Sequence, residues 1–336
     1  MRILAVNYEY TLSGSTLILL RLAEHLRQTG HDVSTCAMVR RDGPIKEAYR
    51  ERGFTVLEPP FSVAADLAIC NTIMTAPQVV ALSEKAKTIW WIHEGANGLA
   101  HLLRNPNDIA AFAQASATVF PVAYQRDSIY RSFIYDKELM RFLVIPLGIP
   151  PIAPPSPVRQ KRPDLRIVSV GNIYPRKRYQ DLIRAVAQYQ APARCTIAGK
   201  FYTLPDDCLK LIASNPDRFE LTGELEHDAI LRLVGEADVF CLPSDSEVLP
   251  LTTLEAAMLE RPIILSDLPV YEGIWRHGRN CLVYPVGAVG MLAQYLPMLA
   301  GNAELRAQLG AAARQTAEPY SDTAFFARFD GLLNSL

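Results

Sequence analysis

Several patterns that mark common protein classes are missing from the 336 residues of this chain. No run of about 18 consecutive apolar residues occurs, so an ordinary membrane-spanning helix is not expected. The six cysteines form no CxxC pair, and we interpret them as reduced core thiols rather than a zinc site or a disulfide framework. The GxGxxG fingerprint and the GxxxxGK[ST] loop are also absent, which argues against dehydrogenases and P-loop enzymes.

Charge of one sign is not in excess. The net charge is −1, and residues 1–150 carry 15 Lys and Arg against 14 Asp and Glu, which leaves 19 against 21 for the rest. Without a basic half, nucleic acid is not an expected partner. The opening MRILAVNYEY has too short an apolar run for a signal peptide, so we expect a cytoplasmic protein, at most peripheral at the inner face of the cell membrane.

The chain does contain enough apolar sequence for two cores. Hydrophobic residues make up 49% of its length, and a single core stops growing at roughly 250–300 residues. Short apolar runs alternate with stretches of helical period, which is the pattern of parallel sheets with crossover helices. We therefore predict an α/β protein with two Rossmann-like, doubly wound domains that face a central cleft.

The expected elements follow from these runs. The predicted strands are Ile3–Val6, Asp32–Val39, Thr55–Leu57, Leu67–Cys70, Thr88–Ile92, Ala117–Phe120, Leu143–Pro146, Arg166–Val170, Cys195–Ala198, Phe219–Leu221, Val239–Leu242, Pro262–Leu265 and Cys281–Tyr284. The clearest helix is Thr16–Thr29, whose buried face is predicted to hold Leu17, Leu20, Leu22, Ala23 and Leu26.

Proline content indicates where the domains separate. Residues 151–164 hold so many prolines that they can neither pair in a sheet nor continue a helix, and we predict a semi-rigid linker there. The expected N-terminal domain is then 1–150, an acceptor domain, and the donor domain is 165–319. Residues 320–336 are predicted to form a helix that packs back on the N-terminal domain.

The most informative segment is Ser246–Met258, which directly follows a predicted strand. It places Glu247 in a loop and Glu255 inside the next helix. Thr252 or Thr253 is expected to cap this helix, whose first backbone N–H groups would form an anion site suited to a diphosphate. Glu255 could accept hydrogen bonds from a ribose and Glu247 from sugar hydroxyls. The alternative is a capped surface helix with two solvated carboxylates.

A second segment, Val170–Arg184, reads as a strand, a turn at Gly171 and a helix. Arg176, Lys177 and Arg178 open that helix. Cations at a helix N-terminus oppose the macrodipole, so their presence favours a bound anion such as phosphate. The alternative is a basic solvated loop.

Both segments resemble the retaining GT-B glycosyltransferases of family 4, also called the group 1 family. The Glu-x7-Glu signature of that family is met by Glu247 and Glu255, and its strand-Gly-Arg…Lys-Gly segment by Gly171 and Lys177. Further similar stretches are Tyr271–Ile274, Gly278–Cys281 and the opening strand, small-residue loop and helix of residues 1–33.

The resemblance implies a hexosyltransferase-like enzyme that moves a sugar from a nucleotide-sugar with retention of configuration. It implies that Lys177 contacts the donor diphosphate, Glu255 the ribose and Glu247 the transferred sugar, and that no metal or other cofactor is needed. The expected absence of a metal agrees with the lack of a DxD pair and of a His/Cys/Asp cluster. The other expected donor-binding residues are Gly14, Ser15, Gly171, Asn172, Arg176, Arg178, Leu249, Leu251 and Thr252.

Three positions depart from the family pattern. Asn172 stands where the family usually has a phosphate-binding arginine, whose place Arg176 or Arg178 could take. Val248 replaces the usual glycine after the first glutamate, and Ser15 replaces the second glycine of the N-terminal loop. Small residues in that loop still allow close backbone approach to a phosphate or an acceptor.

His93 is the third expected catalytic residue, with Lys177 and Glu247. It follows the predicted strand Thr88–Ile92, which places it at the carboxyl edge of a parallel sheet. The family commonly has a histidine here that contacts the donor sugar or the acceptor. Trp90 and Trp91 are interpreted as core residues, one of them pointing away from the cleft face. The histidines interpreted as surface residues are His101, His227 and His277.

The sequence leaves the substrates open. UDP- and GDP-sugars are equally open as donors, and the acceptor class implied by the resemblance is a glycan or a lipid-linked precursor in cell-surface polysaccharide assembly. Candidate acceptor-binding residues near predicted strand ends are Asn7, Tyr8, Tyr10, Asn71 and Asn97. Two alternatives remain, namely a nucleotide-sugar epimerase on the same fold and a non-catalytic relative that binds a partner or a glycan.

Overall fold

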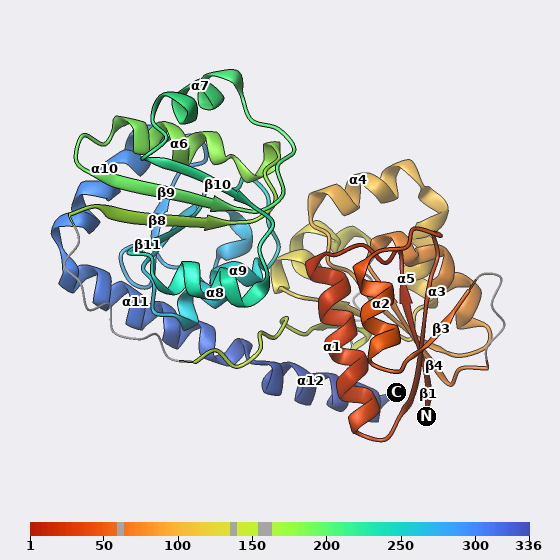
Figure 1. Cartoon of the computed structure of the whole chain (residues 1–336). Coiled ribbons are helices and arrows are strands. Elements are labelled where there is room, and N and C mark those ends of the chain that lie inside the picture. The colour runs from red at the N-terminus through yellow and green to blue at the C-terminus, as the bar shows by residue number, and fades with distance from the viewer. Residues whose placement is uncertain (59–63, 135–139, 154–162) are drawn as a thin grey trace. The chain divides into compact units, whose positions relative to one another are not determined.

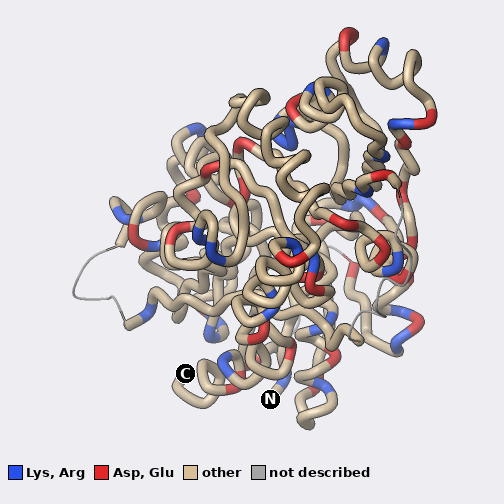
Figure 2. Tube along the Cα trace, turned by 90° about the vertical axis from the view of Figure 1, so that its left-hand side faces the viewer, with Lys and Arg blue, Asp and Glu red and all other residues tan. Residues whose placement is uncertain are grey.

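A computed structural model describes residues 1–58, 64–134, 140–153 and 163–336. The chain divides into two compact units, one of Met1–Gly148 with Asp322–Leu336 and one of Ile149–Ser321 (Figure 1). Most of the predicted proline-rich linker lies outside the described residues. Lys and Arg are interspersed with Asp and Glu along the chain, as expected from the balanced charge (Figure 2).

The N-terminal unit is built on a parallel sheet of order β3-β2-β1-β4-β5-β6-β7. Its strands are β1 (Arg2–Asn7), β2 (Asp32–Ala37), β3 (Thr55–Leu57), β4 (Leu67–Asn71), β5 (Lys87–Trp91), β6 (Ala117–Phe120) and β7 (Phe142–Val144). Its helices are α1 (Gly14–Gln28), α2 (Pro44–Glu51), α3 (Ala76–Ser83), α4 (Ala96–Arg104), α5 (Ala110–Gln114) and α12 (Asp322–Ser335), with the short helical turns η1 (Ile73–Thr75), η2 (Pro106–Ile109), η3 (Gln125–Ile129) and η4 (Arg131–Phe133).

The C-terminal unit repeats this plan with a parallel sheet of order β10-β9-β8-β11-β12-β13. Its strands are β8 (Leu165–Val170), β9 (Ala193–Ala198), β10 (Phe219–Gly223), β11 (Val239–Leu242), β12 (Ile263–Ser266) and β13 (Leu282–Tyr284). Its helices are α6 (Tyr179–Gln188), α7 (Asp206–Ser214), α8 (His227–Gly235), α9 (Leu251–Met258), α10 (Val289–Gly301) and α11 (Ala303–Ala317), with the turns η6 (Pro175–Lys177), η7 (Pro269–Tyr271) and η8 (Glu318–Tyr320).

The α/β class and the doubly wound sheets predicted from the sequence are confirmed. Central strands such as β4 and β11 are buried along their whole length, which is why they read as apolar runs in the sequence. All six cysteines are free and buried, as the interpretation of core thiols requires.

Helix α1 corrects one detail of the predicted core. Leu17 is 42% exposed, although its position suggested the buried face. It lies one helical turn before Arg21 and so shares the polar side of the helix, whereas Leu19, Leu22 and Leu26 face the sheet.

The last helix belongs to the N-terminal unit. Phe325 and Phe329 of α12 are fully buried, and their rings lie 5.5 and 5.2 Å from that of Trp91 on β5. Asp330 of α12 pairs with His25 of α1 at 2.9 Å. In Figure 1, α12 (blue) runs beside α1 (red), although the two helices lie far apart in the sequence.

Both sheets change winding direction beside their first strand. In the N-terminal unit β1 lies between β2 and β4, and in the C-terminal unit β8 lies between β9 and β11. The loops that leave the carboxyl ends of two such neighbouring strands diverge to opposite faces, and ligands of open α/β sheets bind in the crevice between them. Functional residues are therefore expected after β8 and β11, and after β1 and β4.

Candidate functional site

The carboxyl edge of the C-terminal sheet begins with two close-packed glycines. Gly171 follows β8 with a φ of 145°, and Gly199 follows β9 with a φ of 147°. A Cβ atom at Gly199 would overlap the carbonyl of Gly171, so both the backbone angle and the close approach require glycine there. This contact holds the loop after β8 against the end of β9.

The sequence suggested that the three basic residues after β8 open a helix together, but in the structure all three precede α6. Arg176 and Lys177 lie in the turn η6, and Arg178 precedes α6 in the left-handed conformation with a φ of 48°. Their side chains reach different partners. The turn residues reach the loop after β11, while Arg178 turns back on its own helix.

Lys177 and Glu247 form a buried ion pair. The Nζ atom of Lys177 lies 2.6 Å from Oε1 of Glu247, and the two side chains are only 10% and 8% exposed. Ser244, two residues after the end of β11, donates its hydroxyl to the same Oε1 at 2.7 Å. Adjacent strands β8 and β11 thus bring together two residues that are 70 positions apart.

Arg176 adds a second cation to this cluster. Its Nη1 donates to the carbonyl of Ser246 at 2.8 Å and lies 3.5 Å from Oε2 of Glu247. Its Nη2 donates to the hydroxyl of Tyr174, and the guanidinium lies 5.0 Å from the centre of that ring. Since Arg176 is still exposed, its guanidinium remains reachable by an anion.

Glu247 is ionised in this setting. Burial alone would raise the pKa of its carboxyl group, but the charges of Lys177 and Arg176 and the hydrogen bonds from Lys177 and Ser244 outweigh burial and lower the pKa. Glu247 therefore accepts hydrogen bonds and has no proton to donate at neutral pH.

Arg178 is engaged elsewhere. Its Nε and Nη2 atoms lie 2.7 and 3.1 Å from the two carboxylate oxygens of Asp181, which is 1% exposed. The structure also brings Asn172 to the other side of the glycine contact, where its Oδ1 accepts from the backbone N–H of Lys200 at 3.2 Å. Arg176, one of the two arginines expected to replace the missing family arginine, forms a hydrogen bond with the Glu247 loop.

Helix α9 starts two or three residues earlier than a cap at Thr252 or Thr253 would require. Pro250 is the N-cap, its carbonyl accepts from the N–H of Thr253, and no side chain caps the helix. The prediction that Thr252 or Thr253 caps α9 is therefore wrong, because the proline ring fixes φ and starts the helix at Leu251. Both threonines are helical residues, and within the described ranges no side chain caps the first N–H groups of α9.

Glu255 lies in the second turn of α9 and is 7% exposed. Its Oε1 lies 2.9 Å from Nε2 of His227, the first residue of α8. His227 was interpreted as a surface residue. Its side chain is 50% exposed, but its position beside Glu255 makes it part of the candidate site. His101 is also more than a surface residue, since Asp108 holds its Nε2 at 2.9 Å.

A second cluster occupies the carboxyl edge of the N-terminal sheet. His93, just after β5, is hydrogen-bonded through Nε2 to Oδ1 of Asn71 at 2.7 Å. The amide nitrogen of Asn71 donates to the carbonyl of Ser15 in the first turn of α1 at 2.9 Å. Burial lowers the pKa of His93 to about 3, so its ring is neutral. Two predicted residues, Ser15 and His93, are thus joined by a buried asparagine.

The small-residue loop before α1 is ordered by its own hydroxyl groups. Ser13 caps α1 by accepting from the backbone N–H of Thr16 at 3.3 Å, and the Thr16 hydroxyl accepts from the N–H of Ser13 in return. Gly14 is open, since nothing lies within 4 Å of a Cβ placed there.

The acceptor candidates differ widely in accessibility. Asn7, Tyr10 and Asn71 are 0%, 3% and 0% exposed, so none of these side chains can take a substrate directly in this arrangement. Asn97 is exposed on α4, and Tyr8 is half-buried after β1. The sequence could not separate these residues because burial depends on the neighbouring strands.

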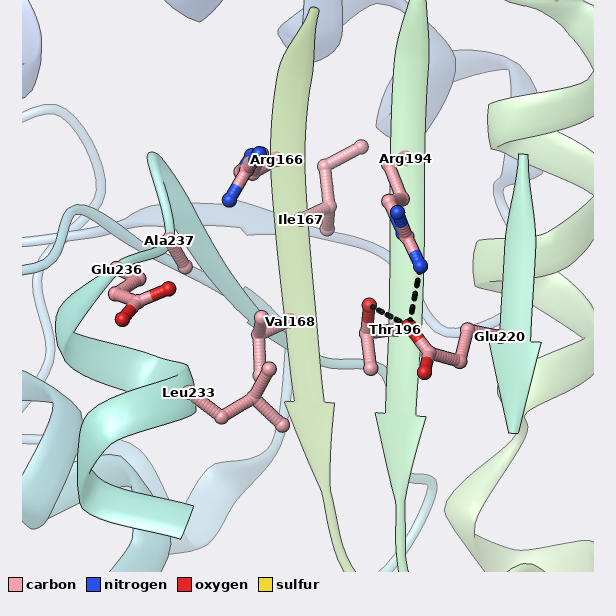
Figure 3. A pocket seen from close by; sticks show the side chains of 9 residues that line it. All are labelled: Arg166, Ile167, Val168, Arg194, Thr196, Glu220, Leu233, Glu236 and Ala237. Carbon is pink, nitrogen blue, oxygen red and sulfur yellow. Dashed lines mark hydrogen bonds and ion pairs between the residues drawn. The ribbon is translucent and has the colours of Figure 1, made fainter. Parts of the chain in front are cut away.

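A cavity in the C-terminal unit lies away from these residues (Figure 3). It occupies about 250 Å³ along the first halves of β8 and β9, near their amino ends. Its Arg194 is paired with Glu220 at 2.9 Å, so that cation is already neutralised. The cavity therefore differs from the candidate site in both position and charge.

Two family models match the chain. Residues 1–119 match the model described as glycosyl-transferase family 4, and residues 156–316 match the model described as glycosyl transferases group 1. The chain belongs to the group 1 glycosyltransferases of the family 4 type.

Curated relatives of this glycosyltransferase match over short regions. Alpha-galactosylglucosyldiacylglycerol synthase of Streptococcus pneumoniae is 33% identical over 112 residues, or 32% of this chain and 30% of the relative. Sulfoquinovosyl transferase SQD2 of Arabidopsis thaliana is 29% identical over 157 residues, or 46% of this chain and 30% of the relative. The matches thus span about a third of the length of each relative.

Solved structures match the glycosyltransferase over its whole length. Anabaena HepE in complex with UDP and glucose gives a TM-score of 0.83 at 16% identity, with both chains fully covered. The lipopolysaccharide outer core galactosyltransferase WaaB gives 0.76 at 16% identity, covering 100% of this chain and 99% of WaaB. At these identities the likeness establishes the fold, which is GT-B.

The described part of the glycosyltransferase holds no group of three or more His, Cys, Asp or Glu side chains arranged to bind a metal ion. Nor is any described helix long and apolar enough to cross a membrane.

Sequence reasoning missed three contacts made by the expected site residues, which are those with Ser244, Asp181 and His227. Ser244 and Asp181 each lie three positions from a predicted site residue, a spacing that allows contact in a turn or helix. His227 gave no comparable signal, since it meets Glu255 only because α8 packs against α9.

Proposed function

We propose that this chain transfers a sugar from a nucleotide-diphosphate sugar to a glycan or lipid-linked acceptor with retention of configuration. The observation that supports this most directly is the cluster of Lys177, Arg176 and Glu247 at the switch point of the C-terminal sheet. It combines cations for a diphosphate with an ionised carboxylate for sugar hydroxyls.

The diphosphate is proposed to lie against the start of α9. Leu251 and Thr252 provide N–H groups in the first turn, with Leu249 in the preceding loop, and the helix dipole favours an anion at this end. Lys177 and Arg176 supply positive charge from the adjacent loop after β8. Together these groups would offset the charge that develops on the departing diphosphate, a role that otherwise falls to a metal ion.

Glu247 is proposed to hold the transferred sugar. Because its pKa is lowered, it accepts hydrogen bonds from sugar hydroxyls and does not act as a general acid. The bond between the anomeric carbon and the diphosphate oxygen breaks as the acceptor hydroxyl approaches from the same face. The acceptor proton then passes to the departing phosphate oxygen, and the configuration is retained.

Glu255 is proposed to bind the ribose of the donor. It is buried on α9, one turn beyond the proposed diphosphate position, and His227 fixes one of its oxygens. In the N-terminal unit, His93 is proposed to bind a hydroxyl of the sugar substrate, and the Gly14–Ser15 loop to approach substrate through its backbone. A lipid-linked acceptor would bring the protein to the inner face of the cell membrane.

The decisive experiment measures binding and turnover with UDP- and GDP-sugars. UDP-glucose is the first donor to test, since HepE was solved with it. At 100 times its dissociation constant a ligand adds about 2.7 kcal/mol of stability, which a thermal shift resolves. We expect one nucleotide to stabilise the chain, with turnover that survives EDTA and a product anomer, identified by NMR, that matches the donor.

A matched pair of double variants tests the site residues. Lys177→Ala/Glu255→Ala should lose donor binding and turnover, whereas Lys210→Ala/Glu304→Ala removes the same charges from exposed positions on α7 and α11 and should change neither. Full activity of the first variant would contradict the proposed function. Donor consumption without an acceptor would indicate an epimerase, and no nucleotide binding a non-catalytic relative.

A further inference from the structure

Three residues from three elements of the N-terminal unit form one hydrogen-bonded line. Ser15 belongs to the first turn of α1, Asn71 is the last residue of β4, and His93 follows β5. The Asn71 amide lies between the other two, 2.9 Å from the carbonyl oxygen of Ser15 and 2.7 Å from Nε2 of His93.

The chemistry of this line fixes the direction of every hydrogen bond. A backbone carbonyl only accepts, so the amide group that faces Ser15 must be the NH2 group of Asn71. The amide oxygen then faces His93. Because an amide oxygen also only accepts, Nε2 of His93 must carry the proton. In the neutral ring this leaves Nδ1 with a free lone pair.

The surroundings prevent the asparagine from turning over. Asn71 is 0% exposed, so a flipped amide would place two acceptors together with no water to separate them. The backbone on either side is fixed as well. Glu94 accepts from the N–H groups of His93 and Ile73 at 3.1 and 2.9 Å, and Thr72 is held with a φ of 78°.

The remaining ring nitrogen is available. Within the described residues Nδ1 of His93 has no hydrogen-bond partner, and it is not among the buried atoms that lack one. Trp91 packs against the imidazole with ring centres 4.6 Å apart and so limits its rotation. A fixed, neutral imidazole with an accessible lone pair is an acceptor for a hydroxyl group.

We propose that Asn71 is a positioning residue that holds His93 as the Nε2–H tautomer, so that Nδ1 accepts a hydrogen bond from a hydroxyl of the sugar substrate. The assignment of the substrate rests on the proposed function, whereas the assignment of the tautomer rests on the hydrogen bonds alone. The lowered pKa of His93 agrees with a neutral ring.

The tautomer can be measured on the unmodified chain. In a 15N-labelled sample without ligand, the ring nitrogens of His93, assigned by their loss in His93→Gln, should show Nε2 protonated and Nδ1 unprotonated at neutral pH. A protonated Nδ1 would overturn the proposal. This result does not depend on donor turnover, so a failure of the proposed function would leave it standing.

Two variants then test the role of Asn71. Asn71→Ala should allow both tautomers, and Asn71→Asp should hold protons on both nitrogens because a carboxylate replaces the amide. Each variant should reduce kcat about tenfold, which is the effect of losing one hydrogen bond to the substrate. The affinity for free nucleotide should stay unchanged. Asn107→Ala, exposed in η2, is the control and should change neither the ring spectrum nor kcat. An unchanged ring spectrum and kcat in Asn71→Asp would also overturn the proposal.

Discussion

At the scale of single residues, the buried pair of Lys177 and Glu247 couples stability to the site. Both side chains are nearly inaccessible, so removing one leaves the other as an uncompensated buried charge. We expect Glu247→Leu to lower the free energy of unfolding by about 3 kcal/mol or more, and Lys177→Met/Glu247→Leu to recover much of that loss. Denaturant titrations of the single and double variants measure this coupling.

The exposed pair of Arg194 and Glu220 is the control for that measurement. Its atoms approach to 2.9 Å, but its side chains are 51% and 44% exposed, so Glu220→Leu should cost no more than about 1 kcal/mol. The buried pair would not be coupled if Glu247→Leu and Glu220→Leu lowered the free energy of unfolding equally. The same would follow if the losses of the two single variants at Lys177 and Glu247 simply added up in the double variant.

His93 makes a separate, pH-dependent contribution. Its pKa is about 3 in the folded chain and about 6.5 when unfolded, so the unfolded state binds the proton more readily between these values. The stabilisation that comes from keeping the His93 ring neutral is fully present above pH 6.5. It is lost progressively as the pH falls below that value. Between pH 7 and pH 5 the free energy of unfolding should fall by up to about 2 kcal/mol more than in His93→Gln. Parallel pH profiles of the two proteins would disprove this.

The site residues show which features of the site can be predicted from the sequence at the scale of single residues. Spacing after predicted strands was enough to single out Lys177 and Glu247. Their contact could not be predicted, because it depends on β8 and β11 lying side by side. For the same reason the sequence suggested Asn71 as a candidate acceptor-binding residue, whereas in the structure it is buried and bonded to Ser15 and His93.

At the scale of elements, α12 stabilises the N-terminal unit from the far end of the chain. Phe329 is fully buried and packs on Trp91, so Phe329→Ala should lower the free energy of unfolding by about 3–5 kcal/mol. Arg328→Ala, exposed on the same helix, should stay within about 0.5 kcal/mol of the unmodified chain. A cost below 1 kcal/mol for Phe329→Ala would mean that α12 is not docked in solution.

Strands were easier to predict than helix starts. The bounds of β6 and β11 agree with the prediction, because interior parallel strands appear as bounded apolar runs. The bounds of the edge strand β3 agree as well. The start of α6 agrees with the helix expected over Tyr179–Tyr189, whereas the start of α9 does not agree. It depends on one backbone conformation, because Pro250 sets the first turn of α9.

At the scale of the whole molecule, the proposed donor groups Lys177, Arg176, Glu247 and Glu255 all belong to the unit Ile149–Ser321. A nucleotide that binds there stabilises that unit by mass action. In hydrogen exchange at 100 times the dissociation constant of UDP, the slowest amides of β8 and β11 should exchange about 100-fold more slowly, provided that they exchange by unfolding of the unit.

The amides of β1 and β4 report on the other unit in the same experiment. If the two units unfold independently, these amides should exchange at the same rate with and without UDP, because the groups proposed to bind the nucleotide all belong to the C-terminal unit. Equal slowing in both sheets would show that the chain unfolds as one cooperative body and would contradict this prediction. Slowing confined to β1 and β4 would place the nucleotide in the N-terminal unit and contradict the donor assignment of Lys177 and Glu255.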